Sequence, residues 1–182
     1  MEEQEKYKTK KQTYVIGIDP DVDKSGVALL DVNNMTLSTY DFTFPYLLEF
    51  LKEQKEKHDD LKIYVEITDR NRTNWHISQH DTVRSAARKG FDVGRNQGLA
   101  KTIIEMAEYM CIAVYPIQPF RKCWQGSGGK ITSMELKRLC EMSGVIFKDN
   151  QTNQEKRDAA LIALYCSNIP IKYKVVESRL NK

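Results

Sequence analysis

The chain has 182 residues, 41% of them hydrophobic and 29% charged, and a formal net charge of +3. This length fits one domain with a sizeable core, and the apolar runs are far shorter than the roughly 20 residues that span a bilayer. Residues 1–12 mix both charges and contain no apolar segment, so we expect a flexible tail and no secretion signal. The composition predicts a cytoplasmic protein with no membrane partner.

The cysteines and the distribution of charge restrict the partners further. The four cysteines form no C-x-x-C pair, which disfavours a zinc knuckle or a disulfide framework and favours reduced thiols. Between residues 84 and 138, ten Lys or Arg stand against four Asp or Glu. This excess is typical of proteins that bind polyanions, because basic side chains release counterions when they neutralise phosphates. A pair of solvated helices would have the same composition.

Alternating and β-branched residues predict the elements of the first half. Four strands are expected, the first three as an antiparallel meander, at 14–19, 26–31, 36–42 and 61–66. Turn residues lie between the first three strands, and a helix with proline in its first turn starts at Pro45. Because a strand, a helix and a return strand form a right-handed crossover, the fourth strand should lie parallel to the first.

The second half alternates helices and strands. The predicted segments are a loop at 67–78, a short basic helix at 79–90, an amphipathic helix from Gly94, a strand at 111–117, a helix opened by the capping box Thr132 to Glu135, and a last helix at 153–168 opened by the capping box Thr152 to Glu155. This order predicts a single α/β domain over 13–169, a mixed sheet flanked by helices, followed by a C-terminal tail at 170–182.

Three carboxylates stand where the apolar pattern predicts other residues. Asp19 ends the first strand, Glu66 ends the strand parallel to it, and Asp158 falls on the apolar stripe of the last helix. Parallel strands end on one side of a sheet, where α/β proteins bind ligands. Asp19 and Glu66 should converge there, with Asp158 and Glu155 alongside. Strand-end acids are also common turn caps, and Glu155 already serves as a capping-box glutamate in this interpretation.

Converging carboxylates indicate a cation. Two of them about 4 Å apart repel by roughly 1 to 4 kcal/mol, so the cluster would be destabilising without one. Oxygen ligands suit Mg²⁺, with Mn²⁺ as a substitute. Two such ions about 3.5–4 Å apart can activate a water and stabilise the leaving oxygen in phosphodiester hydrolysis. The acid cluster therefore indicates a site for two metal ions.

Four segments of the chain form an ordered set of motifs, IGIDPDVDKSGVALLD, YVEI, GRNQGLAKTIIEMA and NQEKRDAALIALY. Together they resemble the RuvC-like Holliday junction resolvases of the ribonuclease H-like superfamily, over Tyr14 to Ser167. The resemblance implies a ribonuclease H-like mixed sheet and a Mg²⁺-dependent endonuclease, often a homodimer, that cuts branched DNA symmetrically. It places the metal-binding, catalytic acids at Asp19, Glu66, Glu155 and Asp158.

The resemblance also bears on DNA binding. Lys122 and Lys130 match positions where the family places basic residues near DNA, and Arg95 and Arg121 of the basic stretch are further candidates. For Lys130 there is an independent argument, because the preceding GSGG can form an anion site with its backbone amides at a helix N-terminus. A flexible linker is the alternative for this segment.

The chain departs from the family pattern at three places. Asp21 replaces the usual glycine after Asp-Pro and either alters the turn or adds an acid to the site. The segment between Glu66 and Gly94 is longer than usual, and Asp69 stands where members that distort the junction carry an aromatic residue. Trp75 in this segment could stack on an unpaired base or pack against a partner subunit.

Two other motifs are set aside. Trp124 and Ile131 replace the first glycine and the hydroxyl residue of a P-loop, so no nucleotide cofactor is predicted. His76 and His80 lack the glutamate of the H-E-x-x-H zinc motif.

The predicted function is a structure-selective DNA endonuclease that resolves four-way junctions by paired phosphodiester hydrolysis, in recombination and repair or in phage DNA processing. The alternatives are a non-catalytic module of the same fold that binds branched nucleic acid, and a sugar kinase or actin-like ATP-binding domain.

Overall fold

A six-stranded mixed sheet forms the centre of the computed structural model, which describes residues 13–67 and 80–171. Its strands are β1 (Tyr14–Asp19), β2 (Ser25–Asp31), β3 (Thr36–Phe42), β4 (Leu61–Glu66), β5 (Ala113–Ile117) and β6 (Ile146–Phe147), in the spatial order β5-β4-β1-β2-β3-β6. β1, β2 and β3 pair antiparallel, whereas β4 is parallel to both β1 and β5. The predicted meander and the parallel fourth strand are confirmed.

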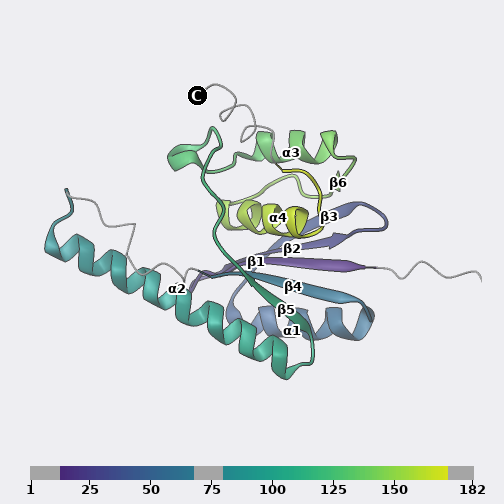
Figure 1. Cartoon of the computed structure of the whole chain (residues 1–182), viewed down its shortest axis with the longest axis horizontal. Helices are drawn as coiled ribbons and strands as arrows, with labels where there is room; N and C mark the ends of the chain where they lie inside the picture. Colours follow the sequence, from purple (N-terminus) through teal and green to yellow (C-terminus); the bar gives the residue numbers. More distant parts are fainter. Residues whose placement is uncertain (1–12, 68–79, 172–182) are drawn as a thin grey trace, which may run out of the picture.

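Helices cover both faces of the sheet (Figure 1). α1 (Phe44–Lys57) and α2 (Val83–Tyr109) lie on one face, and α3 (Ser133–Met142) and α4 (Gln154–Cys166) on the other. Each face of the sheet needs a cover because the side chains of a strand such as β1 alternate between the two faces. Ile16 and Ile18 pack into the core beneath α1 and α2, whereas Val15 packs into the core beneath α4. The arrangement is a mixed sheet flanked by helices, as the sequence predicts.

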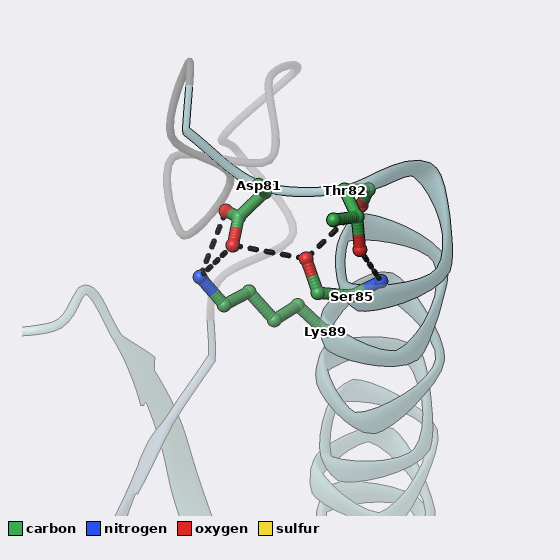
Figure 2. Close-up of polar contacts among 4 residues, drawn as sticks. All are labelled: Asp81, Thr82, Ser85 and Lys89. Atoms are coloured by element: carbon green, nitrogen blue, oxygen red, sulfur yellow. Dashed lines mark hydrogen bonds and ion pairs between the residues drawn. The ribbon is translucent and has the colours of Figure 1, made fainter.

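The helix α2 differs from the prediction, because the two helices expected at 79–90 and from Gly94 are one continuous helix of 27 residues. Glycine within a helix costs about 1 kcal/mol relative to alanine but keeps its backbone hydrogen bonds. The helix N-terminus is well capped (Figure 2), because the Thr82 hydroxyl accepts a hydrogen bond from the Ser85 amide at 3.2 Å and the Asp81 carboxylate pairs with Lys89 at 2.8 Å. In the described ranges, no helix has the length and apolar character needed to cross a bilayer.

The edge strand β6 was not predicted, because two residues are too few to show a periodic pattern. It pairs parallel with β3. Beyond β6, a side chain takes the place of a strand and bonds to β3. The Asp149 carboxylate accepts hydrogen bonds from both the amide and the hydroxyl of Thr39. This carboxylate therefore satisfies the Thr39 amide at the edge of β3 beyond the end of β6.

The start of α4 corrects the second predicted capping box. Asn153 is the N-cap, and its side-chain oxygen accepts from the Lys156 amide at 2.9 Å. The hydroxyl of Thr152, the predicted cap, instead lies 3.0 Å from the Ser133 hydroxyl. Glu155 thus stands at the second helical position, one residue too early for the glutamate of a capping box. The first predicted box, from Thr132 to Glu135, is confirmed with both of its hydrogen bonds.

Candidate active site

Two carboxylates end the adjacent parallel strands at the centre of the sheet. The register pairs Ile18 of β1 with Val65 of β4, so Asp19 and Glu66 follow at the same level on neighbouring strands. Neighbouring strands lie about 4.8 Å apart. Both acids also belong to the α4 face, because side chains alternate along each strand and the preceding Ile18 and Val65 pack beneath α1 and α2. The predicted convergence of these two acids therefore follows from strand register.

Two glycines allow the backbone of α4 to lie directly on the sheet. A Cβ atom added to Gly26, the β2 partner of Asp19, would collide with the carbonyl oxygen of Glu155. One added to Gly17 would collide with the backbone of Ala159. The absence of side chains at these two positions brings the first turns of α4 down to the end of β1. This close approach places Glu155 and Asp158 alongside the strand-end acids.

Burial and neighbouring charges act on the acids of the site. Burial raises the pKa of Asp19 well above its usual value, and repulsion from Glu66, Asp158 and Glu155 raises it further. Burial, followed by repulsion from Asp158, raises the pKa of Glu66 to about 7. Burial also raises the pKa of Asp158, against a side-chain hydrogen bond from Gln154 that lowers it. The folded chain thus holds at least three carboxyl groups in a form that resists ionisation.

A pocket of about 120 Å³ brings two of these acids together with basic residues. Glu66 and Asp158 line it, and so do Arg121, Lys122 and Lys130. The charges of Lys122 and Lys130 lower the pKa values of Glu66 and Asp158 and partly oppose the effect of burial. Three of the predicted DNA-binding residues therefore lie around the same opening as the acids.

The GSGGK segment is neither of the two structures considered from its sequence. It closes on itself around the short 3₁₀ turn η1 (Ser127–Gly129), where the Gly126 amide donates to the Lys130 carbonyl at 2.9 Å and the Gly129 amide donates to the Gly126 carbonyl at 2.9 Å. These amides are therefore not aimed at an anion, and the segment is not an open linker. Glycine is needed at the turn because Gly128 and Gly129 have φ values of 65° and 74°. What the loop presents to the pocket is the Lys130 side chain.

A second pocket, of about 150 Å³, lies on the other side of the two strand-end acids, against α2. Asp19 and Glu66 line it together with the amide residues Asn96 and Gln97. Asn96 fixes the turn after β1, because its side-chain oxygen accepts from the Val22 amide at 3.3 Å and its nitrogen donates to Asp21 at 3.4 Å. The Asp21 carboxylate is thus bound into the turn, where it also accepts from the Asp23 amide at 2.9 Å.

The remaining predicted residues lie apart from these pockets or outside the described ranges. Arg95 is exposed on α2, 5.6 Å above the Phe91 ring, and lines neither pocket. Trp75 and Asp69 fall in residues 68–79, outside the part of the chain that the structure describes.

Sequence reasoning missed two residues that contact the site. The Gln154 side chain donates to the Asp158 carboxylate at 2.8 Å and accepts from Arg157 at 2.8 Å. The available signal was the position of Arg157 in the first turn of a helix, where the macrodipole disfavours a positive charge.

The donor chemistry of the site fits a divalent cation. All four acidic side chains offer oxygen ligands, which Mg²⁺ and Mn²⁺ prefer, and a cation would relieve the repulsion that contributes to the raised pKa values of Asp19 and Glu66. Among residues 13–67 and 80–171, no three His, Cys, Asp or Glu side chains form a group that could hold a metal ion as they stand. The residues that could supply ligands on closer approach are Asp19, Glu66, Glu155 and Asp158.

Comparisons with known proteins find likeness in structure. No protein-family model and no curated sequence matches the chain. It resembles Thermus thermophilus RuvC, with 16% identity over 84% of this chain and 92% of that one, at a TM-score of 0.48. It also resembles the large terminase nuclease from the thermophilic phage G20c, with 13% identity over 85% and 82% of the two chains and a TM-score of 0.42. The yeast mitochondrial Holliday junction resolvase Ydc2 matches with 14% identity over 86% and 78%, at a TM-score of 0.41.

At these identities the likeness concerns the fold alone. The strand order and the helix layers define an α/β domain built on a mixed sheet with helices on both faces (Figure 1).

Proposed function

We propose that the chain is a divalent-metal-dependent endonuclease that cuts branched DNA, with four-way junctions as the substrate. The observation that carries this proposal is that the start of α4, with Glu155 and Asp158, lies against the strand ends that carry Asp19 and Glu66, next to a pocket lined by Lys122 and Lys130. Clustered carboxylates destabilise a fold unless they serve a cation. Lysines at the rim of an acidic pocket suit a phosphodiester backbone that must approach those carboxylates.

In this proposal the four acids hold Mg²⁺, or Mn²⁺ in its place, as two ions per site. The metal supplies Lewis acidity and an activated water for phosphodiester hydrolysis. Lys122 and Lys130 attract and neutralise the phosphates, and Arg121 extends the positive surface. Asp19 and Glu66 lie at the ends of strands, so they are held more rigidly than loop residues would be.

Paired cuts in a symmetric junction require two sites, and we propose a homodimer to provide them. The N-terminal half of α2 extends beyond the sheet (Figure 1), and large apolar side chains on it are exposed. Val83 is 90% exposed and Phe91 is 65% exposed. A second copy of the chain would bury these residues.

The test is cleavage of labelled four-way junction, fork and linear duplex in Mg²⁺ by the wild type and by Asp19→Asn. Paired nicks in the junction that are lost in Asp19→Asn, while junction binding persists, would support the proposal. Branch-selective binding with no cleavage in either Mg²⁺ or Mn²⁺ would contradict it and favour a non-catalytic binding module.

A further inference from the structure

Arg157 joins the start of α4 to the segment that carries Lys130. Its guanidinium donates from all three nitrogens, Nε to the Ile131 carbonyl at 2.9 Å, Nη1 to the Thr152 carbonyl at 2.6 Å and the Ser133 hydroxyl at 3.2 Å, and Nη2 to the Gln154 side-chain oxygen at 2.8 Å. Ile131 follows Lys130 directly, so one side chain fixes the basic loop against the helix that bears Asp158.

These contacts set the orientation of the Gln154 amide. A guanidinium only donates hydrogen bonds, so the oxygen of Gln154 faces Arg157 and its nitrogen is turned the other way. That nitrogen donates to Oδ1 of Asp158 at 2.8 Å. With the amide held at its other end, this hydrogen bond restricts rotation of the Asp158 carboxylate.

The position of Arg157 in the helix indicates that these contacts have a function. A positive charge in the first turn of a helix opposes the macrodipole, at a cost of about 0.3 to 1 kcal/mol. Capping of the helix does not account for Arg157, because the side chain of Asn153 provides the cap. The contacts of the guanidinium with the Lys130 loop and with Gln154 offset this cost. Through Gln154 they connect Arg157 to one acid of the site, Asp158.

We propose that Gln154 and Arg157 are positioning residues for the metal site: Arg157 orients the Gln154 amide, and Gln154 holds the Asp158 carboxylate ready to bind the cation. This inference rests on the proposed function, because it gives Asp158 the role of a metal ligand. Hydrogen bonds to ligating carboxylates restrict the ligand before the metal arrives, and their loss commonly weakens metal affinity 10- to 100-fold.

The test compares Gln154→Met with the matched control Gln151→Met. Methionine resembles glutamine in length and helix propensity but cannot donate to Asp158. Gln151 is exposed and precedes the helix. We expect Gln154→Met to weaken Mn²⁺ binding, measured by electron paramagnetic resonance titration, by about tenfold, while the control binds as the wild type does. Thermal unfolding in EDTA should show that both variants are folded at the temperature of the titration.

A second variant, Arg157→Lys, retains the positive charge, but its single ammonium group cannot replace the three nitrogens of the guanidinium as hydrogen-bond donors. We expect Mn²⁺ affinity to fall here too, with a lower melting temperature because contacts to the Lys130 loop are lost. In cleavage assays, Gln154→Met should need about tenfold more Mg²⁺ for half-maximal rate and should recover the wild-type rate at saturation.

The outcomes separate the two proposals. Wild-type Mn²⁺ affinity in Gln154→Met, together with loss of affinity in Asp158→Asn, would overturn the positioning role and leave the metal site standing. Failure of the wild type itself to bind Mn²⁺ would overturn the metal site and the positioning role with it.

Discussion

Replacement of Glu66 by glutamine should make the protein more stable at alkaline pH in the absence of divalent cations. The pKa of Glu66 rises from an ordinary 4.5 to about 7 in the folded chain, mainly through burial. Since a tenfold change in proton affinity corresponds to about 1.4 kcal/mol, ionisation of Glu66 costs the fold about 3 kcal/mol.

The sign follows from proton binding. Between pH 4.5 and about 7 the folded chain binds more protons at Glu66 than the unfolded chain does, so the free energy of unfolding falls as the pH rises through this window. The amide of Glu66→Gln does not titrate, and its advantage over the wild type should grow by up to about 3 kcal/mol between pH 4.5 and pH 8. For a chain of this size that is a difference of roughly 6 to 12 °C in melting temperature.

Differential scanning calorimetry in EDTA at several pH values would measure this difference, with the exposed α2 residue Glu105 changed to glutamine as the control. Addition of Mg²⁺ at pH 8 should stabilise the wild type more than Glu66→Gln, because the proposed cation binds the ionised carboxylate. Parallel stability curves for the wild type and Glu66→Gln from pH 4.5 to pH 8 would refute this account of the site.

Three further changes test the close contact of α4, the basic loop and the exposed helix. Gly26→Ala should destabilise the fold by about 1 to 3 kcal/mol in chemical denaturation, whereas Gly98→Ala, which meets open space on α2, should stabilise it by up to about 1 kcal/mol. In a plot of log DNA affinity against log salt concentration, Lys122→Ala should reduce the magnitude of the slope by about one. An unchanged slope would exclude a contact between Lys122 and a phosphate. Phe91→Asp should turn a dimeric wild type into a monomer in light scattering, and unchanged mass would exclude α2 as the interface.

Local pattern was sufficient to predict most of the fold. β1 and β4 are short runs of apolar residues that each stop at an acid, and parallel pairing of the two strands follows from the helix between them. Asp158 could be placed because helical spacing is regular. Strand register and the close contact of α4 with Gly17 and Gly26 bring these acids to one end of the sheet, whereas their role as metal ligands stays a prediction.

What the sequence did not show depends on contacts between distant segments. Arg157 reaches Ile131, 26 positions earlier in the chain, and nothing in either segment alone indicates that contact. Thr152 and Asn153 are both good caps, and the choice between them depends on the bond that Thr152 makes to Ser133 instead. The continuity of α2 was missed because glycine lowers helix propensity without ending a helix.

The order of the elements along the chain has a consequence for synthesis. Asp19 and Glu66 are synthesised before Glu155 and Asp158, which belong to α4, the last described helix. This helix packs against Gly17 of β1 and Gly26 of β2. A nascent chain therefore displays the first two acids without the other two. The proposed nuclease would therefore remain inert until α4 has been synthesised and has packed on the sheet.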